Sequence, residues 1–271
     1  MPDDNETKTI RDFLEVAAAT GVPTLTVGAN ARTLVFDVHH GLQARRRTLD
    51  WDFAARFGSW AGYRAFAERL QAEGVFKAGA APHRFVHTGT GIPIDVVPFG
   101  GLADAQGKLV WPETEQEMSV RGFEAAFEYA ERIDLAGEEM RVATPAWHVA
   151  LKLAAYADRR AEKDLSDLNY ILEHATNAFS ERVFDELAEL LADDLSYDEA
   201  GPYLIGQDLA KQAPPETAVE LLNVLSGLLD EPNQLELRRH LLKLSTSHYR
   251  EAELKQIVAR FAALRRGIGS L

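Results

Sequence analysis

The stretch LDWDFA, residues 49 to 54, decides the fold of the N-terminal part of this chain. Apolar and acidic residues alternate along it, and such alternation predicts a β-strand, because successive side chains of a strand point to opposite faces of its sheet. Trp51 and Phe53 therefore share the face that packs on the core. Asp50 and Asp52 share the opposite face, on neighbouring positions.

A third acid is predicted on the same side of the sheet. The segment IPIDVVPFG, residues 92 to 100, indicates another strand with Asp95 on the face opposite its apolar residues. Carboxylates on same-side positions of neighbouring strands raise one another's pKa unless positive charge lies among them. Two Mg²⁺ ions, which Mn²⁺ can replace, would supply that charge, because they prefer oxygen ligands and share themselves with substrate phosphates. Asp50, Asp52 and Asp95 are therefore candidate metal ligands, and Asp95 is the candidate general base for an attacking hydroxyl.

Phosphate-binding features surround this strand. Gly28 ends a predicted strand, residues 22 to 28, and precedes a helical segment, so its backbone can approach a phosphate at which the first helical N–H groups point. The segment ARRR, residues 44 to 47, supplies positive charge just before the acids. Arg46 or Arg47 could bind a triphosphate through charge-assisted hydrogen bonds. The alternative is a surface loop in which these arginines pair with the acids that follow.

The hydrophobic period predicts two domains of different character. From about residue 143 the sequence is almost entirely helical: Thr144 caps a first helix that begins at Pro145, and five or six further helical segments follow. Before that point strands alternate with helices, which are expected at residues 9–21, 29–41, 60–74 and 122–131. We therefore expect an α/β (α+β) fold with a domain of residues 1–143 around a short mixed sheet. Residues 144–271 then form a helical domain.

Composition predicts a cytoplasmic protein and does not exclude an anionic partner. The net charge is −13, yet residues 1–100 hold eleven basic and eleven acidic residues, so the surplus acid lies entirely in residues 101–271. A positive patch can therefore persist near the arginines, and the local field decides whether a phosphate is attracted. The chain has no cysteine, its start is acidic and polar, and no apolar run approaches the ~20 residues of a membrane span.

The order of these motifs resembles a known family. VGANARTL, GLQARRRTLDWDFA and IPIDVVPFG together resemble the AbiEii/AbiGii toxin-type branch of the DNA polymerase beta-like nucleotidyltransferases. Its pattern is a Gly-(Ser/Ala) turn, then Arg-x-(Thr/Ser)-x-Asp-x-Asp, then an Asp on a later strand. Four further segments extend the resemblance to roughly residues 20–215: HRFVHTGTGIPIDVVPFG, WPETEQEMSVRGFEAAFEYA, ALKLAAYADRRAEKDLSDLNYIL and YLIGQDLA.

This resemblance implies roles for individual residues. The N-terminal domain would be a nucleotidyltransferase catalytic domain, over whose nucleotide cleft the helical domain closes. The implied catalytic and metal-binding acids are Asp50, Asp52 and Asp95, and the implied nucleotide-binding positions are Gly28, Ala29, Arg46, Thr48, Lys152 and Asp164. Ala29 departs from the pattern, since many members of the wider superfamily have Ser there, and phosphate contact at this point would rest on backbone N–H groups.

Several of these residues also have a purely structural interpretation. Asp164 and Asp167 lie on one helix face and could form a helix N-terminus with an ion pair to Lys163. His83 and Arg84 could contact substrate or make strand-end hydrogen bonds. Three tryptophans are expected in the core rather than as base-stacking surfaces: Trp51, Trp60 and Trp147.

The implied reaction is transfer of a nucleoside monophosphate from an NTP to an acceptor hydroxyl. Some members of the resembled family extend the 3′ end of tRNA, which implies a tRNA acceptor, a separately encoded antitoxin and a role in phage defence. One alternative is nucleotidylation of a protein side chain or of a small molecule such as an aminoglycoside. Another is an inactive nucleotide-binding or interaction module, against which the intact acids argue.

Overall fold

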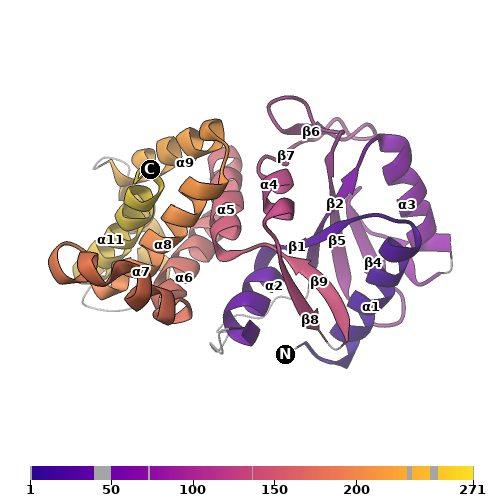
Figure 1. Cartoon of the computed structure of the whole chain (residues 1–271). Helices are drawn as coiled ribbons and strands as arrows, with labels where there is room; N and C mark the ends of the chain where they lie inside the picture. The colour runs from indigo at the N-terminus through magenta and orange to yellow at the C-terminus, as the bar shows by residue number, and fades with distance from the viewer. Residues whose placement is uncertain are drawn as a thin grey trace. The chain divides into compact units, whose positions relative to one another are not determined.

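The computed structural model describes residues 2–39, 50–72, 74–135, 137–230, 234–244 and 250–270. The chain divides into two compact units, Met1–Thr144 and Pro145–Leu271. The first unit contains a mixed β-sheet with helices, and the described residues of the second form helices (Figure 1). The predicted α/β class, with a mixed sheet followed by a helical part, is confirmed.

The sheet of the first unit has seven strands in the order β3-β4-β5-β2-β1-β9-β8. The pairs β2–β5 and β1–β9 are parallel, and the other neighbours are antiparallel. A separate antiparallel pair consists of β6 and β7. The strands are β1 Thr24–Val27, β2 Trp51–Phe57, β3 Phe76–Ala78, β4 Arg84–His87, β5 Pro93–Gly100, β6 Lys108–Val110, β7 Glu117–Ser119, β8 Glu131–Leu135 and β9 Glu138–Val142.

Helices α1 and α3 pack on the sheet through aromatic side chains. Phe13 of α1 stacks on Phe53 of β2 with ring centroids 4.1 Å apart, and Phe66 of α3 meets Phe13 edge to face. Trp51 and Phe53 are buried, as the alternation of the LDWDFA stretch predicts. The helical elements of this unit are α1 Asp4–Ala19, α2 Gly28–Thr33, the π-helical turn Leu34–His39, α3 Trp60–Ala72 and α4 Phe123–Glu128.

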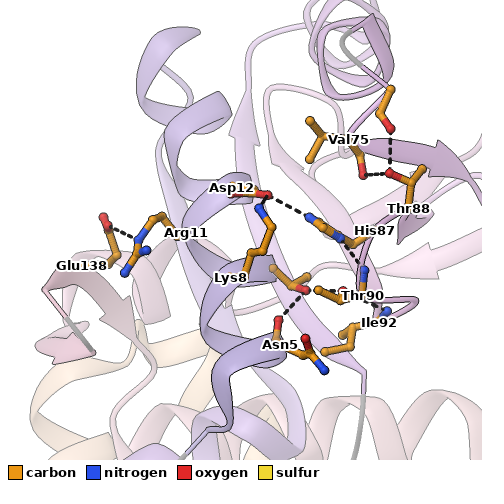
Figure 2. Close-up of polar contacts among 12 residues, drawn as sticks. Asn5, Lys8, Arg11, Asp12, Val75, His87, Thr88, Thr90, Ile92 and Glu138 are labelled. Carbon is orange, nitrogen blue, oxygen red and sulfur yellow. Dashed lines mark hydrogen bonds and ion pairs between the residues drawn. The ribbon is translucent and has the colours of Figure 1, made fainter.

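Helix α1 is tied to the β4–β5 hairpin by a small polar network (Figure 2). Asp12 Oδ2 accepts from Lys8 Nζ at 2.8 Å and lies 2.8 Å from His87 Nε2. The backbone N–H of Thr90 donates to His87 Nδ1 at 3.0 Å, so the ring proton lies on Nε2 and points at Asp12. The hydroxyls of Thr9 and Thr90 are 2.7 Å apart. The buried ring of His87 thus has both nitrogens satisfied, which makes it a structural residue.

This network gives the stability of the first unit a pH dependence. Burial raises the pKa of Asp12, but the hydrogen bonds from Lys8 and His87 and the positive charge of Lys8 outweigh it and bring the pKa below 3.8. A depressed folded-state pKa contributes stability above the unfolded value that is lost as pH falls through the folded one. We therefore expect Asp12→Asn to lower the free energy of unfolding by about 1 kcal/mol at pH 7 and by less at pH 3. Urea unfolding at both pH values checks this, and an equal difference at both contradicts it.

The second unit is built around α8, which packs against α5, α6, α7 and α11. Six helices follow α5 in the described residues, in agreement with the predicted five or six. Trp147 is buried, as expected. In the other unit Trp60 is half-buried against Trp111, so its assignment to the core holds only in part. The helices are α5 Pro145–Arg159, α6 Glu162–Ala178, α7 Ser180–Asp193, α8 Tyr197–Gln212, α9 Pro215–Leu229, α10 Gln234–Leu244 and α11 Arg250–Ile268.

Glycines allow α8 to lie against its neighbours at very short range. A Cβ atom on Gly201 would lie 2.1 Å from the backbone N of Thr176 in α6. A Cβ on Gly206 would lie 2.3 Å from the carbonyl oxygen of Leu264, and one on Gly267 would lie 2.2 Å from that of Tyr203. Backbone thus meets backbone where α8 crosses α6 and α11. Within the described ranges, none of the helices combines the length and the apolar character needed to cross a membrane.

Candidate active site

The three predicted acids lie on one face of the sheet, where β2 and β5 begin. Asp52 is the register partner of Asp95 in the parallel β2–β5 pair, so the two side chains point the same way. Asp50 lies two residues before Asp52 and on the same face. Asp95 is buried, whereas the side chain of Asp50 is 41% exposed. The fold therefore gathers acids that are 43 residues apart in sequence.

Gly28 lies directly against the carboxylate of Asp52. Val27, the last residue of β1, is paired with Asp52, and Gly28 then starts α2 with φ at +75°. A Cβ at this position would lie 1.9 Å from Asp52 Oδ2 and 2.8 Å from Asp52 Cβ. Ala29 is the second residue of α2, and its carbonyl accepts from Thr33 Oγ1 at 3.1 Å. The glycine is thus required both by the backbone conformation and by the space that Asp52 occupies.

A contribution that the sequence did not single out comes from Asn30. This residue is buried in α2, and its side-chain amide donates to the backbone carbonyl of Asp50 at 2.9 Å. The bond fixes the backbone immediately before β2. Asn30 therefore positions the acid-bearing strand relative to the helix that begins at Gly28.

Gly28→Ala should disturb this site more than an equivalent substitution elsewhere in the unit. Gly21 provides the control, because its φ of +65° is similar and a Cβ there would meet nothing within 4 Å. Gly21→Ala is expected to cost about 1 kcal/mol through the left-handed backbone alone. Gly28→Ala adds a clash with the whole Asp52 side chain, and we expect about 3 kcal/mol. Urea unfolding of both variants measures the difference, and equal losses would mean that Asp52 moves aside freely.

Arg84 occupies the centre of the acid cluster. It is the register partner of Asp95 across the β4–β5 pair, and its guanidinium binds that carboxylate through Nε–Oδ1 and Nη2–Oδ2 contacts of 2.7 Å each. Its Nη2 also lies 3.4 Å from Asp50 Oδ2. The hydrogen bonds to Asp95 raise the pKa of Arg84 above its usual value. Of the two interpretations open for Arg84, the structure thus shows hydrogen bonding at the start of a strand, directed at a predicted site residue.

His83 lies beside the same carboxylate, and its side chain is less exposed to solvent than that of Arg84. Its Nε2 is 4.0 Å from Asp95 Oδ2, and its buried Nδ1 has no hydrogen-bond partner among the described residues. Burial lowers the pKa of His83; Asp95 opposes this shift and Arg84 adds to it. The ring is therefore neutral at pH 7. Because the partly buried His83 is neutral, Arg84 is the cation that touches this carboxylate among the described residues.

The donor chemistry of the cluster fits a divalent cation. Asp50, Asp52 and Asp95 offer hard oxygen ligands on one face, and the guanidinium of Arg84 already supplies positive charge to two of them. Within the described residues, no three His, Asp or Glu side chains are arranged around a common point as metal ligands. The carboxylates thus have the chemistry of a metal site, while Asp95 is directed at Arg84.

Two further predicted site residues, Lys152 and Asp164, lie in an ion-pair cluster of the second unit. Asp164 is fully buried near the start of α6, and Arg159 binds it with Nε–Oδ2 and Nη2–Oδ1 distances of 2.7 and 2.6 Å. Lys152 Nζ lies 3.5 Å from Asp164 Oδ1 and 2.5 Å from Asp167 Oδ2. The structure therefore brings Lys152, Asp164 and Asp167 together. Lys152 contacts both acids, Arg159 makes the shorter contacts with Asp164, and Lys163 is exposed.

Two predicted positions, Arg46 and Thr48, lie outside the described residues. The arginine-rich segment of residues 44–47 does so as well.

Comparison with known proteins identifies the family of the chain. The family model that matches the chain describes a nucleotidyl transferase, and the match spans residues 87–260. Because it covers more than half of the chain, the protein belongs to the family of AbiEii nucleotidyl transferase toxins of type IV toxin–antitoxin systems. The matched region contains Asp95, Lys152 and Asp164, whereas Asp50 and Asp52 precede it.

Solved structures of low similarity were also found. The antibiotic-resistance factor ANT(2″)-Ia is 14% identical, with a TM-score of 0.41, and the match covers 70% of this chain and 91% of that one. An antigenic nucleotidyltransferase-like protein from Paracoccidioides brasiliensis is 12% identical, with a TM-score of 0.41 and coverage of 70% and 92%. JHP933 from Helicobacter pylori is 14% identical, with a TM-score of 0.33 and coverage of 86% and 95%. No curated protein matches the chain.

Proposed function

We propose that this protein transfers a nucleoside monophosphate from an NTP to the 3′-terminal hydroxyl of tRNA, with release of pyrophosphate and dependence on divalent cations. Membership of the AbiEii nucleotidyl transferase family supports the reaction class. The observation that carries the proposal is the pairing of Asp52 with Asp95 across β2 and β5, with Asp50 on the same face.

The acids would have distinct roles in this reaction. Asp50 and Asp52 would hold two Mg²⁺ or Mn²⁺ ions, and Asp95 would hold one of them while a carboxylate oxygen accepts the proton of the attacking hydroxyl. Bound cations of this kind lower the pKa of the hydroxyl and support the leaving pyrophosphate. Positioning by the protein supplies the rest, since phosphoryl transfer needs little covalent participation of side chains.

The nucleotide phosphates would be held by backbone and basic groups. Gly28 and Ala29 offer backbone N–H groups at the start of α2, while Arg46 and Thr48 precede the acids in sequence. For Lys152 we infer a phosphate-binding role as well. For Asp164 we infer a supporting role: it is fully buried and bound to Arg159 and Lys152, so it orients these cations.

The proposed acceptor and partner follow from charge and family. tRNA is strongly anionic, and residues 101–271 carry all of the surplus acid, so RNA would bind over the surface formed by residues 1–100, whose charges balance. As a member of a type IV toxin family, the protein would be partnered by a cognate antitoxin, in a system that defends against phage.

The test is a labelling reaction. The protein is incubated with total RNA, total protein and an aminoglycoside, with each α-labelled NTP in turn, in Mg²⁺ or in EDTA, beside Asp52→Asn. We expect Mg²⁺-dependent label on tRNA. Label on protein or on the aminoglycoside would contradict tRNA as the acceptor and would support nucleotide transfer to that other acceptor. Equal label with the wild type and Asp52→Asn would exclude catalysis at this cluster.

A further inference from the structure

Arg84 occupies the carboxylate oxygens of Asp95 that the proposed reaction requires for metal binding. Both oxygens of Asp95 accept hydrogen bonds from it, at 2.7 Å each. A carboxylate engaged in this way offers its best lone pairs to the guanidinium. A divalent cation and Arg84 therefore compete for the same oxygens of Asp95.

The backbone of Arg84 is held in place by its own turn. The N–H of Gly79 donates to the carbonyl of Arg84 at 2.7 Å, and the N–H of Arg84 donates to the carbonyl of Ala81 at 2.9 Å. A Cβ on Gly79 would lie 2.6 Å from Arg84 Cγ, so the glycine leaves room for the stem of the side chain. Withdrawal of Arg84 from Asp95 is thus a change of side-chain rotamer that leaves the strand in place.

Exposure makes the guanidinium the mobile partner of the pair. The side chain of Arg84 is 37% exposed, whereas that of Asp95 is 11% exposed and that of Asp50 is 41% exposed. Asp95 is buried in a central strand of the sheet, with His83 Nε2 4.0 Å from its Oδ2, so it cannot follow the guanidinium outward. An arginine that leaves the cluster reaches water at small cost, because its long side chain already extends to the surface.

We propose that Arg84 is a displaceable counter-ion of the acid cluster, which pairs with Asp95 and lends positive charge to Asp50 in the metal-free protein and must leave Asp95 before a divalent cation binds there. The inference rests on the proposed function, because it assumes that these acids bind metal. Arg84 is then a positioning residue. The apparent affinity for metal equals the intrinsic affinity multiplied by the fraction of molecules in which Arg84 has left Asp95.

Mn²⁺ binding tests the competition directly. The affinity of the nucleotide-free protein for Mn²⁺ is measured by titration calorimetry or by the EPR signal of free Mn²⁺. We expect Arg84→Ala to bind about tenfold more tightly than the wild type, since a pair formed about nine-tenths of the time costs that factor. The gain in Mn²⁺ affinity from Arg84→Ala should disappear when Asp95 is also changed, so Arg84→Ala/Asp95→Asn should bind Mn²⁺ no more tightly than Asp95→Asn. Arg132→Ala is the matched control: it removes the same charge from an exposed pair with Glu139 in the same unit.

Two further readouts separate displacement from other effects. A purely through-space repulsion is screened by salt, whereas a partly buried contact is screened much less, so the gain should persist in 0.5 M KCl. In thermal unfolding, Arg84→Ala should be less stable than the wild type without metal, and Mn²⁺ should stabilise it more than it stabilises the wild type. A merely structural arginine would leave a stability loss that Mn²⁺ does not repair.

The outcomes distinguish this inference from the proposed function. Equal Mn²⁺ affinity in the wild type and Arg84→Ala, or a gain that high salt removes, would overturn the role of Arg84 and leave the metal site standing. Absence of Mn²⁺ binding in both proteins would overturn the metal site and with it the inference. A gain retained in the double variant would place the cation away from Asp95 and would also contradict the proposal.

Discussion

Asp52→Asn is expected to lower the rate of nucleotide transfer by about 1,000-fold, which corresponds to roughly 4 kcal/mol of transition-state stabilisation. Asparagine has nearly the same shape as aspartate, so the contact with Gly28 and the pairing with Asp95 should survive. The neutral amide would bind divalent cations poorly, so bound cations would no longer stabilise the negative charge that develops on the phosphates.

The measurement is the initial rate of label transfer at saturating NTP. Asp134→Asn serves as a control, because Asp134 belongs to the same unit and its carboxylate caps the exposed β8–β9 turn by accepting from the N–H of Gly137 at 3.2 Å. We expect wild-type rates for this control. More than a tenth of the wild-type rate in Asp52→Asn, with the protein folded by circular dichroism, would remove Asp52 from the chemistry.

Gly206→Ala is expected to destabilise the second unit by about 3 kcal/mol or more. Alanine normally favours a helix over glycine by about 1 kcal/mol, so the expected sign runs against helix propensity. The added Cβ would lie 2.3 Å from the carbonyl oxygen of Leu264 and 2.8 Å from the Cα of Gly267. Both are backbone atoms that no rotamer change can move, so α8 and α11 must separate and lose packing along their length.

The matched control for this prediction is Gly227→Ala. Gly227 lies inside α9, and a Cβ there would meet nothing within 4 Å, so the substitution should stabilise by up to about 1 kcal/mol. Thermal unfolding followed by circular dichroism measures both variants. A midpoint for Gly206→Ala at or above that of the wild type would show that the two helices can part without loss.

The alternation of short apolar and acidic stretches was sufficient to predict the acid-bearing face. In LDWDFA and IPIDVVPFG the apolar residues repeat with period two, and the structure buries Trp51 and Phe53 on one side while Asp52 and Asp95 pair on the other. Such patterns are local, because the direction of each side chain depends only on its place in the strand. The place of Gly28 between a strand and a helix could also be predicted from the sequence, although its contact with Asp52 could not.

Contacts that depend on pairing register could not be predicted in the same way. Arg84 meets Asp95 because the turn between β4 and β5 places them opposite each other, and a slip of one residue would turn Arg84 to the other face. The sequence left Arg84 open between two roles for this reason. Likewise, Gly206 and Gly267 are ordinary helical glycines until α8 and α11 cross.

The hairpin β8–β9 was missed for a different reason. Its strands alternate in burial, with Ile133, Leu135, Met140 and Val142 inside, but charged residues fill the outward positions and β8 is the edge of the sheet. Charge on an edge strand prevents pairing with other chains. It also weakens the hydrophobic alternation from which a strand is predicted. The sequence could therefore predict the centre of the sheet better than its edge.

The Arg84–Asp95 pair has a consequence for the order in which the sheet forms. Its two members are eleven residues apart on one hairpin, so the chain closes a short loop to make the contact. The β2–β5 pairing that brings Asp52 to Asp95 joins residues 43 apart and is slower to form. We therefore expect the acid-bearing strand β2 to dock on a hairpin in which Arg84 already pairs with Asp95, so that like-charge repulsion opposes this step less.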